Sequence, residues 1–513
     1  MRRLALGIAL GLVVFAAIGG AWYYLRQEPA HFAPAPPYVE PADMSDQVHQ
    51  FCGKCHAYPP AESFPRFAWK EEVERGYNFF GKANLRLTPP KIDDVVRYYE
   101  TRAPERLPGI KINRASTPLP VQFAPHRFVN PPNAMPPCVS HVNLVHLSDR
   151  KRLDILVCEM KHGLVMALRP YEPNPTWRIL GKVTNPAHAE VIDLDGDGVL
   201  DIVVADLGSF PPTDRLSGSV VCLRGNKDGT FTPQTLFKDV GRVADVQAAD
   251  FNGDGKLDLV VASFGWQEAG EIIVLENISR DRDHLAFKPH VVDKRHGAIH
   301  VPVIDLNKDG KPDFVALIAQ EHEEVCAFVN QGNFKFQMKP LYTAPHPAYG
   351  SSGIQLVDLD GDGQTDVLYT NGDVLDSPHL LKPYHGLQWL RNKGNLEFEH
   401  RPIAAMYGIH RAVAADVTGN GRLDIVAVSY LPEEHFPQRG EVNADAIVLF
   451  EQTSPGQFVR HTVASKTCDH VACAVGDVFG TGRLDIVTAN FTMNERLDSL
   501  VVLKNLGRAP HKK

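Results

Sequence analysis

The sequence predicts a mainly β protein, a seven-bladed propeller that follows a small all-α domain and an N-terminal apolar segment. An acidic loop of pattern D-x-D-x-D-G-x-x-D that leads into an apolar strand occurs six times. The copies end at Asp201, Asp258, Asp313, Asp366, Asp424 and Asp485, and a decayed seventh ends at Asp154. Their spacing of roughly 47 to 61 residues leaves room for about four short strands per unit, which is the organisation of a propeller.

The N-terminus predicts a membrane anchor. The chain of 513 residues has a net charge of −8 and 22% charged residues, which excludes the basic footprint of a nucleic-acid binder. Leu4–Leu25 holds no charged residue and follows two arginines. We therefore expect residues 1–25 to cross a bacterial inner membrane once and to leave the bulk of the chain in the periplasm. A cleaved signal peptide is the alternative, because Gly19-Gly20-Ala21 offers small residues to a peptidase.

A haem motif follows the Pro-rich and Ala-rich linker that we predict at 26–44. Cys52-Gly-Lys-Cys55-His56 matches C-x-x-C-H, in which both thiols form thioethers to haem and the histidine ligates iron. A zinc knuckle or a redox dithiol is the alternative, but the sequence has no second C-x-x-C to complete a zinc site. The motif predicts one covalent haem c.

Residues 45–107 resemble a small monohaem cytochrome c domain. The segment from Thr88 predicts a helix with one apolar face, formed by Ile92, Val95, Val96 and Tyr99. The resemblance implies a methionine as sixth iron ligand, yet no Met occurs between His56 and Met135. The sixth ligand therefore remains open: it is Met135, His126 or Tyr77, or the iron is five-coordinate. A five-coordinate haem binds small ligands, whereas a His/Met haem shuttles electrons. Residues 108–117 read as a linker.

The repeat resembles the FG-GAP/VCBS family of propeller blades over residues 118–507, with a tail at 508–513. Side-chain oxygens at loop positions 1, 3, 5 and 9 enclose a hard cation such as Ca²⁺, and the glycine at position 6 permits the turn. Four loops are complete, which predicts about four structural calcium ions. Their ligands are Asp193, Asp195, Asp197, Asp201; Asp250, Asn252, Asp254, Asp258; Asp305, Asn307, Asp309, Asp313; and Asp358, Asp360, Asp362, Asp366. Blade six keeps only two carboxylates, and blades one and seven are not expected to bind calcium.

Closure of the ring is predicted from a missing strand. Blade seven has no outer strand, because the chain ends soon after Leu500. The segment from Val121 to Phe128 has the required aromatic pattern, so we expect it to pair with the last blade and remove its free edge.

A set of histidines is predicted at the opposite mouth of the channel, where each innermost strand begins. Positions five to seven before the first loop position hold, blade by blade, His141, His188, Asp245, His300, Ser352 or Gly353, His410 (beside Arg411) and His470. Imidazoles that converge on a funnel can bind a transition metal, accept protons or bind an anionic or sugar-like ligand. The alternative is that they cap strand ends by hydrogen bonding to loops. Cys468 and Cys473 are close enough in sequence to form a disulfide.

Three functions are compatible with these features. The first is a periplasmic c-type cytochrome that transfers electrons to or from a redox partner protein docked on a calcium-stabilised propeller. The second is an oxidoreductase with a metal or substrate in the funnel, and the third is a carbohydrate-binding or adhesion propeller. The sequence shows no nucleophilic triad, phosphate loop or nicotinamide fingerprint, so it assigns no reaction.

Overall fold

The computed structural model describes residues 40–508, apart from 84, 113–117, 132–133, 283, 443 and 495–496. The predicted membrane anchor at 1–25, most of the linker at 26–44 and the tail after residue 508 lie outside the described residues. Within the described part of the chain, no helix is both long enough and apolar enough to span a bilayer.

The N-terminal described segment is helical. It contains α2 (Met44–Cys52), α3 (Trp69–Lys82) and α4 (Ile92–Arg102), with short 3₁₀ turns at Ala61–Ser63 and Arg66–Ala68.

An aromatic core joins α3 to α4. The ring of Trp69 stacks on that of Tyr99 with centroids 3.8 Å apart, and the Trp69 indole N–H donates to the Ala61 carbonyl. Val95 and Tyr99 are buried as the helical pattern predicts, but Ile92 is 36% exposed and Tyr98 is buried instead. Ile92 is the first residue of α4, and positions 95, 98 and 99 share one face of a helix.

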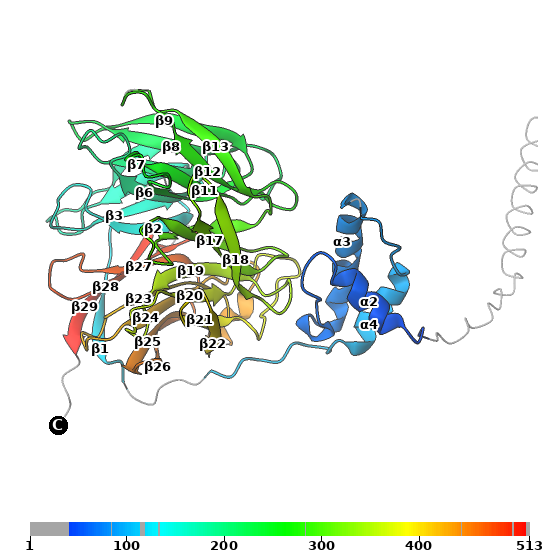
Figure 1. Ribbon diagram of the computed structural model, residues 1–513. Helices are drawn as coiled ribbons and strands as arrows, with labels where there is room; N and C mark the ends of the chain where they lie inside the picture. The colour runs from blue at the N-terminus through cyan, green and yellow to red at the C-terminus, as the bar shows by residue number, and fades with distance from the viewer. Residues whose placement is uncertain are drawn as a thin grey trace, which may run out of the picture. The chain divides into compact units, whose positions relative to one another are not determined.

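Seven antiparallel sheets follow one another along the chain and form the propeller (Figure 1). Blades one and two contain β2 (Val139–Val145), β3 (Asp154–Glu159), β4 (Leu164–Leu168), β5 (Arg178–Lys182), β6 (Pro186–Ile192), β7 (Asp201–Asp206), β8 (Gly218–Gly225) and β9 (Phe231–Val240). Blades three and four contain β10 (Val243–Ala249), β11 (Asp258–Ser263), β12 (Glu271–Asn277), β13 (Phe287–Asp293), β14 (Ala298–His300), β15 (Val303–Ile304), β16 (Asp313–Ile318), β17 (Glu324–Asn330) and β18 (Phe336–Thr343).

The remaining blades repeat the same order. Blades five to seven contain β19 (Ser351–Val357), β20 (Asp366–Asn371), β21 (Gly386–Asn392), β22 (Phe398–Ala405), β23 (Ile409–Ala415), β24 (Asp424–Ser429), β25 (Asp445–Ser454), β26 (Gln457–Ser465), β27 (His470–Gly476), β28 (Asp485–Asn490) and β29 (Leu500–Arg508). A 3₁₀ turn at Pro437–Gly440 lies in the β24–β25 connection. The prediction of seven blades is confirmed.

The last blade is closed by the N-terminal strand, as predicted. β1 (Val121–His126) pairs antiparallel with β29, from Val121 opposite Arg508 to His126 opposite Val502. Figure 1 shows the two strands side by side. Blade seven therefore has four strands in the order β1-β29-β28-β27, and its edge is covered.

The apolar core lies between neighbouring blades. Val203 and Ala205 of blade two pack in one cluster with Val246 and Val261 of blade three, and the other blades repeat this arrangement. A single blade cannot bury both of its faces, so each depends on its neighbours. The innermost strands, such as β2 beside β6 and β19 beside β23, are left to line the centre.

Candidate functional site

The haem motif begins where α2 ends. Cys52 is the last residue of the helix and is half-buried, while Cys55 is exposed in the following turn. His56 donates its Nδ1–H to the Ala57 carbonyl oxygen at 2.8 Å, since a carbonyl can only accept. The lone pair is therefore on Nε2, which is the tautomer that an iron-ligating histidine needs.

Apolar side chains accompany this donor set. Phe51 packs against Tyr77 and Phe80, each at 5.0 Å between ring centroids. Leu85 and Leu87, in the connection from α3 to α4, are large apolar side chains left partly exposed. The residues fit haem c: Cys52 and Cys55 would supply the thioethers and His56 the axial ligand.

The candidates for the sixth ligand lie in different parts of the fold. The Tyr77 hydroxyl, on α3, donates to the Pro90 carbonyl at 2.7 Å, and burial raises the pKa of this phenol. His126 lies in the closing strand β1, with its ring against Phe128 at 4.8 Å and Phe479 at 5.0 Å. Met135 precedes β2 in the propeller. Of the three, only Tyr77 belongs to the helical segment, so the sixth ligand stays a prediction.

The acidic loops connect the first and second strands of their blades. In blade two, carboxylate oxygens of Asp193, Asp195 and Asp197 lie within 4.8 Å of one another, and those of Asp358, Asp360 and Asp366 do so in blade five. Backbone N–H groups shape the loop: those of Asp197 and Gly198 both donate to Asp193 at 3.0 Å. Clustered carboxylate oxygens are the ligands that Ca²⁺ prefers.

The last aspartate of each loop also has a structural role. Asp258 is buried and accepts the N–H of Phe251 through Oδ2 at 3.0 Å and that of Asn277 through Oδ1 at 2.8 Å. Asp485 of blade seven, which is not expected to bind calcium, does the same with Val478 and Asn505. Burial raises the pKa of Asp258 to about 6. This aspartate anchors the hairpin in each case, and its calcium role stays a prediction.

Arginines distinguish two kinds of acidic loop. Arg224 pairs with Asp195 at 2.7 Å in blade two, and Arg391 pairs with Asp360 at 2.6 Å in blade five. Among the ion pairs of the described residues, the acidic loop of blade four has Lys311, 3.5 Å from Asp309. Where an arginine already neutralises the carboxylates, Ca²⁺ has to displace or share it.

The channel-lining position is the third residue of each innermost strand, five residues before the first loop position. Across the blades it holds His141, His188, Asp245, His300, Gly353, Arg411 and Ala472. In the first six blades a β-bulge precedes this residue, as between Val139 and His141.

Two of the predicted histidines do not occupy this position. A ring nitrogen of His410 lies 3.0 Å from the Val471 carbonyl, and one of His470 lies 3.3 Å from the Ala489 carbonyl. Burial lowers the pKa of both to about 4. They satisfy backbone groups. Arg411 and Ala472 occupy the third strand position in their blades, and Ala472 is buried in the apolar cluster that blades seven and one share.

The funnel cluster consists of His141, His188, Asp245, His300 and Arg411. Nδ1 of His188 lies 3.4 Å from Asp245 Oδ1, and Nδ1 of His300 lies 3.7 Å from Oδ2 of the same carboxylate. The Arg411 guanidinium donates to His300 Nε2 at 3.1 Å. The His141 ring lies 4.2 Å from that of His188, and its buried Nδ1 has no hydrogen-bond partner among the described residues.

Electrostatics assign a charge to each member. Burial opposes ionisation of Asp245, but His188 and His300 hold its pKa far below the ordinary range. Against the effect of burial, Asp245 and Glu190 raise the pKa of His188. Burial and Arg411 lower that of His300, and burial and His188 lower that of His141. Two carboxylates, Asp245 and Glu190, thus lie beside His188, and Arg411 is the permanent cation of the cluster.

Gly353 makes the Arg411 contact possible. A Cβ at this position would lie 3.3 Å from Arg411 Cδ and 3.0 Å from Thr370 Oγ1. The absence of a side chain in blade five lets the Arg411 chain pass across that blade to reach His300 in blade four.

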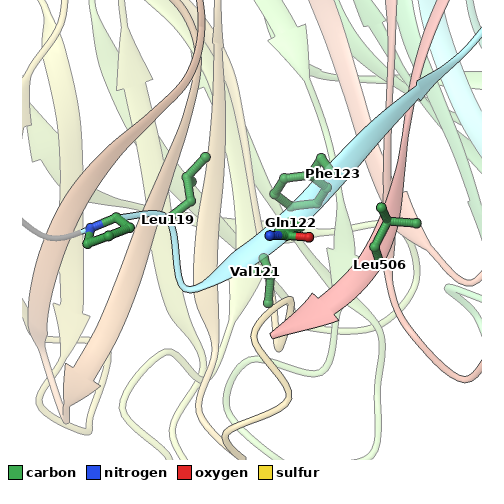
Figure 2. A pocket seen from close by; sticks show the side chains of 6 residues that line it. Leu119, Val121, Gln122, Phe123 and Leu506 are labelled. Carbon is green, nitrogen blue, oxygen red and sulfur yellow. The ribbon is translucent and has the colours of Figure 1, made fainter. Parts of the chain in front are cut away.

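A separate hollow lies at the closing seam. Figure 2 shows Leu119, Val121, Phe123 and Leu506 around it, and its volume is ≈ 390 Å³. None of its lining residues belongs to the funnel cluster or the haem motif. It is an apolar surface hollow beside β1 with no titratable group, so it offers no chemistry.

The cysteines of the described chain are all unpaired. The predicted Cys468–Cys473 disulfide is absent: Cys468, before β27, directs its Sγ to the Ala444 carbonyl at 3.9 Å, while Cys473 lies within β27. Both are buried in the same apolar cluster, where they act as small hydrophobic side chains.

Comparison with known proteins agrees with the repeat. The model of the FG-GAP-like repeat matches residues 193–261 and 305–369, which contain the four complete acidic loops. The chain carries FG-GAP-like repeats. No curated protein matches it. Among solved structures, the crystal structure of BBS1N in complex with ARL6DN, soaked with lead, aligns over 77% of this chain and 99% of that chain, at 10% identity and a TM-score of 0.45.

Proposed function

We propose that this FG-GAP-repeat protein is a membrane-anchored, periplasmic c-type cytochrome, and that its propeller docks the protein with which it exchanges electrons. The observation that carries the proposal is the position of His56 and the hydrogen bond of its ring. It directly follows the C-x-x-C pair, and its Nδ1–H is committed to the Ala57 carbonyl. Bound haem would supply a one-electron carrier.

The protein residues would set the properties of that carrier. The Ala57 hydrogen bond fixes the orientation of the His56 ring and raises its basicity toward a metal. The stacked Trp69 and Tyr99 rings give the helices a rigid core. A rigid core limits rearrangement of the protein, which favours electron exchange.

A visible redox titration of the full-length protein tests this function. We expect one reversible one-electron transition, and no carbon monoxide adduct if the iron is six-coordinate. His56→Ala should keep the thioethers but change the spectrum and the potential, while Cys158→Ala, at a buried thiol of blade one, should change neither. A haem-free protein, or a spectrum unaffected by His56→Ala, would contradict the proposal.

A second candidate is supported by the funnel cluster. The Arg411 guanidinium and the imidazoles around Asp245 suit an oxidoreductase that binds an anion and moves a proton. A transition metal fits less well, because the His300 Nε2 lone pair is used by Arg411 and His188 favours its protonated form.

Inorganic phosphate is a suitable probe of this candidate. Its addition should shift the imidazole NMR signals of His188 and His141, and Arg411→Gln should suppress the shift. A shift of equal size in Arg411→Gln would remove the funnel as an anion site.

A further inference from the structure

Two histidines and a glutamate meet at the end of blade four that lies opposite the acidic loops. His296 lies in the connection from β13 to β14, and Glu321 and His322 lie in the hairpin between β16 and β17. Because the strands are antiparallel, both connections are at the same end of the blade. The backbone N–H of Ala319 donates to the Gly297 carbonyl at 2.8 Å and holds the two together.

The three side chains offer one ligand atom each within 4.8 Å of one another. His296 Nε2 lies 2.9 Å from Glu321 Oε2, and the His296 and His322 rings are 5.4 Å apart between centroids. Ligands at ~2.0–2.2 Å from one tetrahedral ion lie about 3.3 Å apart, so a small rotation of these side chains brings all three to one centre.

The charge of the site suits a cation. The nearby Arg295 is engaged elsewhere, by Asp293 at 2.7 Å and Glu324 at 2.6 Å. No competing cation therefore pairs with Glu321 in the described structure.

His322 is the most informative member. The described residues give it no hydrogen bond, although its ring lies beside His296. A purely structural His–Glu pair does not need it. The fold offers such a pair for comparison in blade one, where His162 Nδ1 lies 2.9 Å from Glu159 Oε2 with no third ligand grouped beside it.

We propose that His296, Glu321 and His322 bind a divalent transition-metal ion of the Zn²⁺ type. Two imidazoles and one carboxylate form a ligand set that such ions use when one coordination position stays open to solvent or substrate. The site is separate from the acidic loops, whose oxygen-only ligands select Ca²⁺. It is also independent of the haem motif.

Zinc titration of the full-length protein tests the site. The protein is stripped with chelator and saturated with Ca²⁺ to fill the acidic loops, and Zn²⁺ binding is measured by calorimetry and by metal analysis. We expect a zinc site that His322→Ala weakens by at least ~10–100-fold, the loss caused by removing even an outer partner of a metal ligand. His162→Ala should leave the zinc affinity unchanged, and His322→Ala should keep the wild-type melting temperature.

Three outcomes would overturn the proposal. The first is no zinc binding by the Ca²⁺-saturated wild type, and the second is equal affinity in wild type and His322→Ala. The third is a loss of zinc in His141→Ala with none in His322→Ala, which would place the ion in the funnel cluster.

Discussion

The two ends of the propeller follow different rules. At the end that carries the acidic loops, the same loop recurs from blade to blade, and its last aspartate accepts the same pair of backbone N–H groups, as Asp258 and Asp485 show. At the opposite end, the channel position holds histidine in three blades and four different residues in the other four, which are Asp245, Gly353, Arg411 and Ala472. The residues that recur from blade to blade are those that each blade needs in order to fold. The residues that vary are those that form the surface of the channel in the assembled ring.

Physical chemistry explains the contrast. The last aspartate of the loop satisfies buried donors of its blade, because an unpaired buried donor costs about 1–3 kcal/mol. Asp258 accepts one N–H of the loop and one at the end of the third strand, whereas Asp154 of blade one accepts the Ser148 N–H and the Tyr171 hydroxyl. That cost recurs in each blade, so its solution does too. The channel end has no such shared requirement, and a cluster such as Asp245 with His188 and His300 exists only because particular blades are neighbours.

The largest effect should come from removing calcium, which acts on the repeated end in several blades at once. An ion present at 100 times its dissociation constant stabilises the folded state by about 2.7 kcal/mol, so four sites together contribute several kcal/mol. Chelation should lower the melting temperature of the full-length protein, and Asp360→Ala should lose one ion. A melting temperature insensitive to chelator would show that the loops fold without metal.

Replacing one repeated anchor should have the next largest effect. Asp258→Ala leaves the N–H groups of Phe251 and Asn277 without an acceptor, for a loss of about 2–6 kcal/mol in unfolding free energy. Asp258→Asn keeps one carbonyl oxygen and should lose less. Urea unfolding measures both variants. Equal and small losses would mean that water replaces the carboxylate at no cost.

Acid should act on the opposite end through His410 and His470. Their folded pKa values of about 4 lie below the unfolded value of about 6.5, so between these limits only the unfolded chain binds the protons. Stability therefore falls as pH falls through this window, by about 2 kcal/mol per histidine at pH 5 relative to pH 7. His470→Gln should lose less stability between pH 7 and pH 5 than the wild type, as measured by urea unfolding. An unchanged pH dependence would show that His470 is not buried in its neutral form.

A single methyl group should have the smallest effect. Gly353→Ala introduces a Cβ 3.3 Å from Arg411 Cδ, at a cost of ~1 kcal/mol. By displacing Arg411 it should raise the pKa of His300, which NMR titration detects. Ala472→Gly, at the matching position of blade seven, should leave this pKa unchanged. No shift in Gly353→Ala would mean that Arg411 reaches His300 by another path.

The repeats could be predicted from the sequence because the same residue pattern occurs in blade after blade. The acidic loops predicted the blade number, and the missing outer strand predicted the pairing of β1 with β29. The predicted window of three residues contains His188 and His300, which are the third residues of their innermost strands, and His410, which lies one residue before that position and beside Arg411. The role of these side chains as a binding site stays a prediction. A β-bulge in the innermost strand determines which residue takes the third position. That residue is identified by its distance from the acidic loop and not by its type.

The remaining features depend on contacts that no local pattern records. His296 and the Glu321-His322 pair come from two connections that meet only when blade four is folded. The ion pair between Arg391 and Asp360 joins the third strand of blade five to its acidic loop. The tautomer of His56 depends on a single backbone carbonyl.

Intact mass and visible absorption of the denatured full-length protein test the central claim most directly. The protein would be produced in cells that attach haem c outside the cytoplasm. We expect one covalent haem per chain, retained after denaturation and located on the peptide that contains Cys52 and Cys55. A mass equal to that of the polypeptide alone, with both thiols open to alkylation, would contradict it.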